Sequence, residues 1–132
     1  MTSQHKEKLS GVFAPIVTPF RDDEVRLDDL RYNLQHLKNT DLAGYLALGS
    51  NGEFRSLTDE EQIKVLEIFA EERGDKTVMV GTGCESTRET IHKSRIAADM
   101  GFTYVSVLTP GYFAKQMDGP TLTDYYQRVA EA

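Results

Sequence analysis

Short apolar runs alternate with longer amphipathic stretches four times along this chain of 132 residues, with about 30 residues to each repeat. Such alternation predicts a parallel sheet whose strands are joined by right-handed helical crossovers. Two α/β architectures fit: an open four-stranded sheet, and four β-α units that make half of an eight-stranded barrel. Both place the loops that follow the strands on one ligand-binding face. The expected strands occupy residues 11–20, 44–48, 77–80 and 104–108.

The stretches between the expected strands carry helical patterns. Leu27, Leu30, Leu34 and Leu37 recur at spacings of three and four residues, which places them on one helical face and predicts a helix over 28–38. Further helices are expected over residues 58–73, 86–100 and from about 121 onward.

Two of these helices begin with a capping box, in which two side chains satisfy free backbone N–H groups. The pairs are Thr58 with Glu61 and Ser86 with Glu89. Every helix is expected to have a good N-cap, but none follows a tight phosphate-binding loop. Gly81-Thr82-Gly83 lacks the third glycine of the dinucleotide fingerprint. The sequence therefore predicts no nucleotide cofactor.

Composition excludes several classes of function. The net charge is −6 and no cluster of Lys and Arg stands out, which argues against a nucleic-acid surface. No apolar run approaches the roughly 20 residues of a membrane helix. The polar segment 1–10 lacks the apolar core of a secretory signal, so we expect a polar N-terminal tail before a single domain over 11–132.

Cysteine and histidine usage adds two expectations. The single cysteine, Cys84, suits a reducing compartment, so we expect a cytoplasmic protein. The histidines have no spacing typical of metal ligands, which predicts no metal site; they are His5, His36 and His92.

A turn follows the second expected strand, and it is the first candidate site. Gly49 and Gly52 flank Ser50 and Asn51. Glycine permits positive φ angles and the close approach of another molecule to the backbone. Backbone N–H groups there could bind an anion such as a carboxylate. An ordinary Gly-Ser-Asn-Gly turn without a ligand is the alternative.

Four short motifs follow the four expected strands in the order found in one known family. Together they resemble the dihydrodipicolinate synthase / N-acetylneuraminate lyase family, from about Gly11 to the last residue. The second motif, continued by Gly83-Cys84-Glu85-Ser86-Thr87, is most similar to the 4-hydroxy-2-oxoglutarate aldolase branch. The motifs are Thr18-Pro19-Phe20, Gly49-Ser50-Asn51-Gly52-Glu53, Gly81-Thr82-Gly83 and Thr109-Pro110-Gly111-Tyr112.

The resemblance implies a fold and a chemistry. The family fold is a TIM (β/α)8 barrel of roughly twice this length, so this chain would be its N-terminal half. Members are class I aldolases or lyases that need no cofactor. A lysine forms a Schiff base with pyruvate or another 2-oxo acid, and the protonated imine accepts electrons as a C–C bond is made or broken.

The resemblance also implies roles for particular residues. Ser50 would be the hydroxyl that relays protons to a tyrosine, and that tyrosine would be Tyr112. Asn51 would hold the substrate carboxylate, between Gly49 and Gly52. In many members the tyrosine reaches into the site of a neighbouring subunit. Packing of Tyr112 at a subunit contact without catalysis is the alternative.

The Schiff-base lysine has no counterpart in this chain. In the family it lies on the sixth strand, and only four strands are expected here. Lys76 lies at the wrong end of a strand, and Lys115 lies in a polar loop near the functional face. We therefore expect a truncated, proteolysed or split aldolase that is inactive alone.

Two other hypotheses stay open. One is a non-catalytic half-barrel module for binding or assembly, whose open strand edges favour a homo-oligomer. The other is a complete flavodoxin-like domain, which the missing phosphate loop disfavours.

Overall fold

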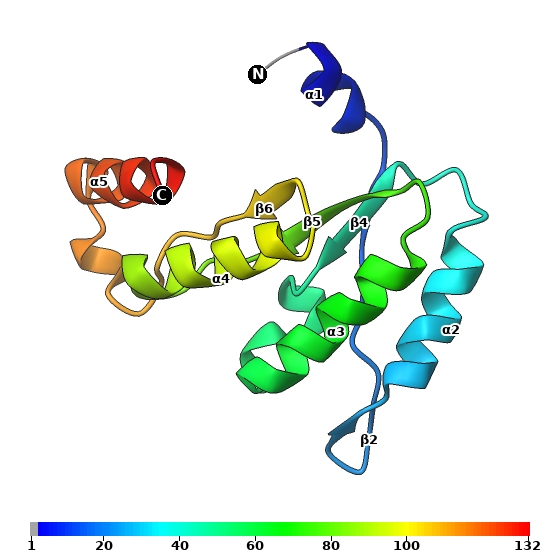
Figure 1. Ribbon diagram of the computed structural model, residues 1–132. Coiled ribbons are helices and arrows are strands. Elements are labelled where there is room, and N and C mark those ends of the chain that lie inside the picture. The colour runs from blue at the N-terminus through cyan, green and yellow to red at the C-terminus, as the bar shows by residue number, and fades with distance from the viewer. Residues whose placement is uncertain (1–2) are drawn as a thin grey trace.

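Four parallel strands form the central sheet of this protein. We describe a computed structural model over residues 3–132, with the side chain of Gln4 left out. The strand order is β1-β4-β5-β6, so consecutive β-α units are neighbours in space (Figure 1). In a flavodoxin-like sheet the order of the strands reverses at a switch point, whereas the strands here follow one another in chain order. The strands are β1 (Phe13–Pro15), β4 (Gly44–Ala47), β5 (Thr77–Gly81) and β6 (Tyr104–Ser106).

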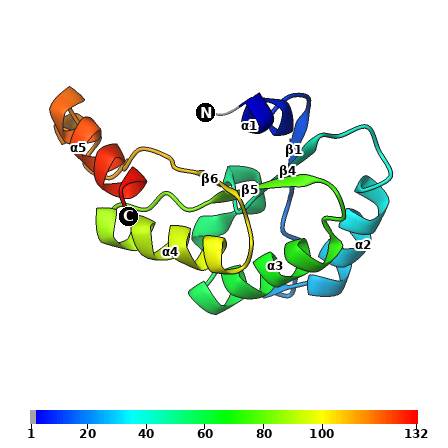
Figure 2. The same ribbon diagram turned by 45° about the horizontal axis from the view of Figure 1, so that its top comes forward.

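Three helices cover one face of the sheet. Figures 1 and 2 show α2, α3 and α4 side by side along it, whereas α5 lies beyond α4 at the end of the sheet. This one-sided cover and the consecutive strand order are those of half of a (β/α) barrel, with the barrel not closed. The helices are α2 (Leu27–Leu37), α3 (Asp59–Glu72), α4 (Thr87–Asp99) and α5 (Gly119–Ala130).

The strand register assigns each side chain to one face. Tyr45 pairs with Val78, and both are buried under the helices. The next residues along, Leu46 and Met79, also pair but point to the opposite face, which would be the barrel interior. Both are only half-buried. The inner face of the sheet is thus less covered than the outer face.

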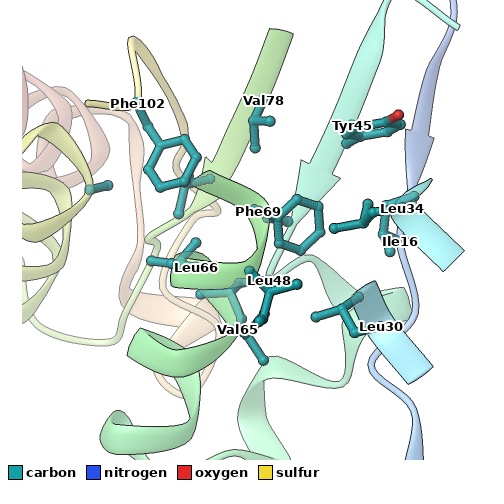
Figure 3. Close-up of a cluster of buried hydrophobic side chains, with 14 of the residues drawn as sticks. Ile16, Leu30, Leu34, Tyr45, Leu48, Val65, Leu66, Phe69, Val78 and Phe102 are labelled. Atoms are coloured by element: carbon teal, nitrogen blue, oxygen red, sulfur yellow. The ribbon is translucent and has the colours of Figure 1, made fainter. Parts of the chain in front are cut away.

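The hydrophobic core lies between the outer face and the helices (Figure 3). Leu30 and Leu34 of α2 and Val65 and Phe69 of α3 are essentially inaccessible to solvent. The ring of Phe69 packs on that of Tyr45, with 6.3 Å between centroids. Burying side chains of this size contributes about 1.5–3 kcal/mol each. The helix with one apolar face that the leucine spacing predicts is confirmed as α2.

Two strands are shorter in the structure than the sequence predicts. The first was expected over 11–20, yet only Phe13–Pro15 pairs with β4. Pro15 lacks an N–H, and the chain continues into a small hairpin made of β2 (Phe20–Arg21) and β3 (Glu24–Val25). The fourth was expected over 104–108, but β6 ends at Ser106.

Helix starts follow the capping rules only in part. The capping box of Thr58 and Glu61 is confirmed with both reciprocal bonds. At α4 only half of the expected box forms, because Ser86 accepts from the N–H of Glu89 at 3.1 Å without the reverse bond. Arg26 precedes α2 and makes no capping bond, so the expectation of a good N-cap on every helix is wrong. The last helix starts earlier than expected, at Gly119.

The polar segment at the amino end contains a short helix, α1 (Ser3–Lys8). Nδ1 of His5 lies 2.8 Å from the hydroxyl of Tyr104, so α1 is held beside the start of β6 (Figure 2). Residues 1 and 2 lie outside the described part, and the division at residue 10 stays a prediction. No helix within 3–132 is long and apolar enough to cross a membrane.

Candidate functional site

Three strands bring their carboxyl ends together around a small cavity of about 70 Å³. The loop after β4 forms one wall, and the ends of β5 and β6 form the others. This is the end of the sheet at which (β/α) barrels bind ligands. The lining residues are Leu46, Leu48, Gly49, Ser50, Phe54, Gly81, Gly83, Ser106 and Leu108.

The loop after β4 is a single turn of 3-10 helix, η1 (Ser50–Gly52), flanked by two left-handed residues. These are Leu48 at φ 53° and Glu53 at φ 51°. Gly49 has φ −82°, so the positive φ angles of this loop belong to non-glycine residues. A left-handed leucine costs roughly 1 kcal/mol or more. The surrounding contacts therefore hold this turn in a strained shape.

The size of the glycines explains why they stand in this loop. A Cβ on Gly52 would lie 3.0 Å from the carbonyl oxygen of Ile16. The hydroxyl of Thr18 donates to the carbonyl oxygen of Gly52 at 2.7 Å, in a buried position. The turn is thus fastened to the segment that follows β1. The side chains of Ser50 and Asn51 remain exposed to solvent.

The loop after β5 lies against both neighbouring strands. A Cβ on Gly81 would be 2.2 Å from the carbonyl oxygen of Leu48, and one on Gly83 would be 2.5 Å from the N of Leu108. Real Cβ atoms do not come this close to backbone. Only glycine lets the three strand ends converge on the cavity.

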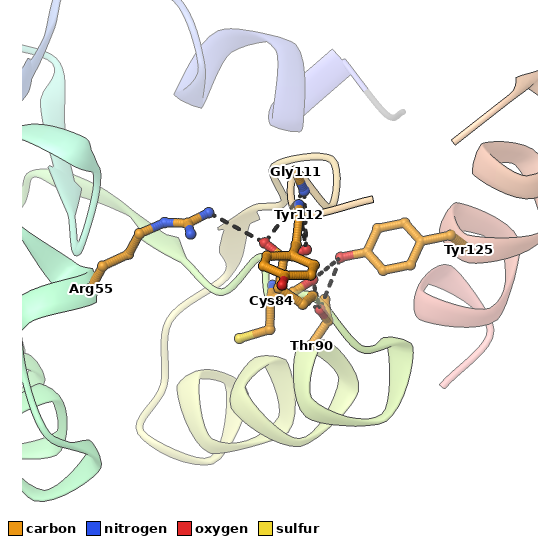
Figure 4. Close-up of polar contacts among 7 residues, drawn as sticks. Arg55, Cys84, Thr90, Gly111, Tyr112 and Tyr125 are labelled. Atoms are coloured by element: carbon orange, nitrogen blue, oxygen red, sulfur yellow. Dashed lines mark hydrogen bonds and ion pairs between the residues drawn. The ribbon is translucent and has the colours of Figure 1, made fainter. Parts of the chain in front are cut away.

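A single carboxylate connects the loops after β4, β5 and β6 (Figure 4). Glu85 accepts hydrogen bonds from the backbone N of Tyr112 at 2.9 Å and of Gly111 at 3.1 Å. Arg55 forms an ion pair with it at 3.5 Å. The N–H of Tyr112 is the largest cause that holds the pKa of Glu85 below its usual value, and Gly111 and Arg55 act in the same direction. Glu85 is therefore ionised at neutral pH.

Buried hydroxyl groups attach α5 to the same region (Figure 4). The hydroxyls of Thr90 and Tyr125 lie 2.8 Å apart, and the N of Cys84 donates to Thr90 at 3.0 Å. Burial raises the pKa of Tyr125 and of the Cys84 thiol. Neither is poised to ionise near neutral pH, so this cluster is structural.

The structure separates the residues predicted for the site into two groups. Gly49 and Ser50 line the cavity, whereas Asn51 is exposed beside it and Gly52 is buried beneath the turn. Tyr112 is 80% exposed, and its ring packs on Phe113 with 4.8 Å between centroids. Among the hydrogen bonds of residues 3–132, none joins Ser50 to Tyr112. The proton relay is therefore not assembled within the described chain.

No lysine lines this cavity. Lys76 lies at the amino end of β5, where its Nζ donates to the carbonyl oxygen of Thr40 at 2.8 Å. The Nζ of Lys93 donates to Asp59 and to Gln62, each at 2.8 Å. Lys115 is exposed in the turn η3 (Ala114–Gln116). The described residues also contain no group of three metal-ligating side chains.

Sequence reasoning missed Glu85 and Arg55 as members of this region. Glu85 was noted only within a motif before the N-cap of α4, and Arg55 follows the Gly-Ser-Asn-Gly turn in η2 (Phe54–Ser56). Their contacts join residues 26 to 30 positions apart in the chain. No local periodicity or capping rule could indicate them.

A sequence model of the Dihydrodipicolinate synthetase family matches residues 8–132. The chain belongs to this family. Two relatives are 4-hydroxy-tetrahydrodipicolinate synthase of Methanothrix thermoacetophila, 38% identical over 123 residues, and a DapA-like lyase of Chloroflexus aurantiacus, 36% identical over 124 residues. Each similarity covers 92% of this chain and 41% of the relative.

Solved structures of two lyases show the same fold as this chain. A dihydrodipicolinate synthase of Aquifex aeolicus superposes with a TM-score of 0.86 at 27% identity, and an N-acetylneuraminate lyase of Proteus mirabilis with 0.84 at 30%. Each covers 93% of this chain and 42% of the solved chain. The expected resemblance to both kinds of lyase is confirmed, and the chain spans less than half the length of these relatives.

The buried bond from Thr18 to Gly52 predicts how the β4 loop responds to substitution. Thr18→Val keeps the shape but leaves the Gly52 carbonyl unpaired, which costs about 1–3 kcal/mol. Thr18→Ser keeps the hydroxyl and serves as the control. We expect hydrogen exchange at the amides of residues 50–53 to accelerate in T18V and not in T18S. Equal exchange in both variants would show that the bond does not hold the turn.

Proposed function

We propose that this chain supplies the first half of a Schiff-base (class I) aldolase or lyase that acts on pyruvate or a related 2-oxo acid. The observation that carries the proposal is the cavity at the ends of β4, β5 and β6, lined by Gly49 and Ser50 in a chain of this family. Alone, the chain holds part of a 2-oxo acid site and no nucleophile.

The β4 turn suits the binding of a carboxylate. Ser50 and Asn51 present a hydroxyl and an amide to solvent beside the cavity, and neither side chain is engaged elsewhere in residues 3–132. Neutral donors of this kind bind a carboxylate without the desolvation cost of burying an opposing charge. In our proposal Asn51 holds the carboxylate, between Gly49 and Gly52, and Ser50 takes part in proton transfer.

Tyr112 completes the proposed relay from an exposed position. An ordinary phenol is a poor acid at neutral pH, so it transfers protons best within a hydrogen-bonded chain. Its 80% exposed side chain is free to meet a second subunit. We propose that Tyr112 acts at a subunit contact, which requires a homo-oligomer.

Two finer assignments belong to the same proposal. The Gly49-to-Glu53 turn and the Gly83-to-Thr87 segment favour a reaction of the 4-hydroxy-2-oxoglutarate aldolase type over one of the dihydrodipicolinate synthase type. The free thiol of Cys84 favours a reducing compartment such as the cytoplasm.

Borohydride trapping tests whether this chain contains the nucleophile. The folded chain is incubated with pyruvate and reduced, and its intact mass is compared with that of Lys115→Arg treated in the same way. We expect no reduced adduct on either protein, because no lysine reaches the cavity. An adduct on the unmodified chain that disappears in K115R would contradict the proposal and make Lys115 the nucleophile.

A non-catalytic assembly module is the second candidate function, and the open sheet favours it. Both edge strands, β1 and β6, lack an outer neighbour in the described chain. Val12 is 67% exposed and Leu108 is 50% exposed next to these edges. Unpaired edges and half-covered apolar faces favour pairing with another chain. Two copies could complete an eight-stranded barrel.

Light scattering after size exclusion tests this assembly. Met79→Lys places a charge on the half-buried inner face, so we expect it to dissociate a dimer into monomers. Glu67→Lys, at an exposed position of α3, is the control and should leave the dimer intact. A wild-type chain that is monomeric at micromolar concentration would exclude the assembly module.

A further inference from the structure

The loop that carries Tyr112 makes few contacts of its own. Nothing lies within 4 Å of where a Cβ on Gly111 would stand, and residues 111–116 are all exposed. Within the described part of the chain, the ring of Tyr112 makes its one aromatic contact with Phe113. Something other than side-chain packing must determine where this tyrosine sits.

Hydrogen bonds from its backbone to the carboxylate of Glu85 hold the Tyr112 loop in place. We infer that Glu85 is a positioning residue, which fixes the backbone of Tyr112 against the loop after β5, with Arg55 as its counter-ion. The inference rests on the proposed function, in which Tyr112 transfers protons. The carboxylate itself touches no predicted reacting group, so its effect on catalysis passes through Tyr112.

The geometry explains why a carboxylate is suited to this task. Two successive N–H groups, of Gly111 and Tyr112, converge on one oxygen at 3.1 and 2.9 Å, and the other oxygen faces Arg55 at 3.5 Å. Charge-assisted bonds of this kind are about twice as strong as neutral ones. Glutamine retains one acceptor oxygen and no charge, and alanine retains neither.

The contacts of Glu85 connect the loop that carries Tyr112 to the segment that follows the β4 turn. Arg55 lies in η2, three residues beyond the turn η1 that contains Ser50 and Asn51, and Glu85 directly precedes the N-cap of α4. The ion pair is exposed and weak by itself, so the two backbone bonds supply most of the positioning. We expect loosening of the Tyr112 loop to decrease in the order E85A, E85Q, R55Q.

NMR of the isotopically labelled full chain tests the clamp directly. An amide proton bonded to a carboxylate moves downfield as the carboxylate ionises. Arg55 is the charged side chain that faces Glu85 and stabilises its ionised form. We therefore expect the amides of Gly111 and Tyr112 to titrate together with the Glu85 side-chain carbon, at a midpoint below the ordinary glutamate value of about 4.3.

Variants separate positioning from general stability. In Glu85→Gln both amide titrations should vanish while the rest of the spectrum is kept, and in Glu85→Ala the loop should also gain rapid backbone motion. Glu67→Gln, an exposed substitution on α3, is the control and should change neither. Tyr112 amides that titrate equally in E85Q, or that never titrate, would overturn the inference.

Pyruvate added to the same sample reports on the proposed function separately. Shifts at residues 49–52 with an intact titration at Tyr112 support both claims. An intact titration of the Tyr112 amide without any pyruvate shift would contradict the proposed function but support the positioning role of Glu85. Pyruvate shifts at residues 49–52 without a titration of the Tyr112 amide would support the proposed function and contradict the positioning role of Glu85.

Discussion

Close backbone contact between the ends of neighbouring strands is the constraint on which this structure depends. Gly81 and Gly83 lie so near to the backbone of Leu48 and Leu108 that no side chain fits between them. The strand ends can therefore converge, and their convergence creates the cavity. Larger residues would force the strand ends apart and remove the site.

One-sided burial determines the architecture. The outer face of the sheet is sealed by α2, α3 and α4, whereas inner residues such as Leu46 and Met79 stay half-buried. The outer face of such a sheet is fully covered by helices, whereas its inner face would be covered only if further strands closed the barrel. This asymmetry follows from the strand register together with the consecutive strand order.

The sequence predicted the elements well because their signals are local. Leucine spacing located α2, and the Thr58–Glu61 pair located the start of α3. It could not predict the left-handed conformation of Leu48, which contacts from other segments impose against local preference. It also missed the Glu85 clamp, whose partners meet only after three β-α units have folded.

We expect the β4 turn by itself to recognise the carboxylate of a 2-oxo acid. An NMR titration of the chain with pyruvate measures this most directly. The predicted result is a saturable set of shifts at residues 49–52 that Asn51→Ala weakens and that Asn39→Ala, an exposed change beyond the end of α2, leaves unaltered. Shifts that spare residues 49–52, or that are identical in N51A, would contradict it.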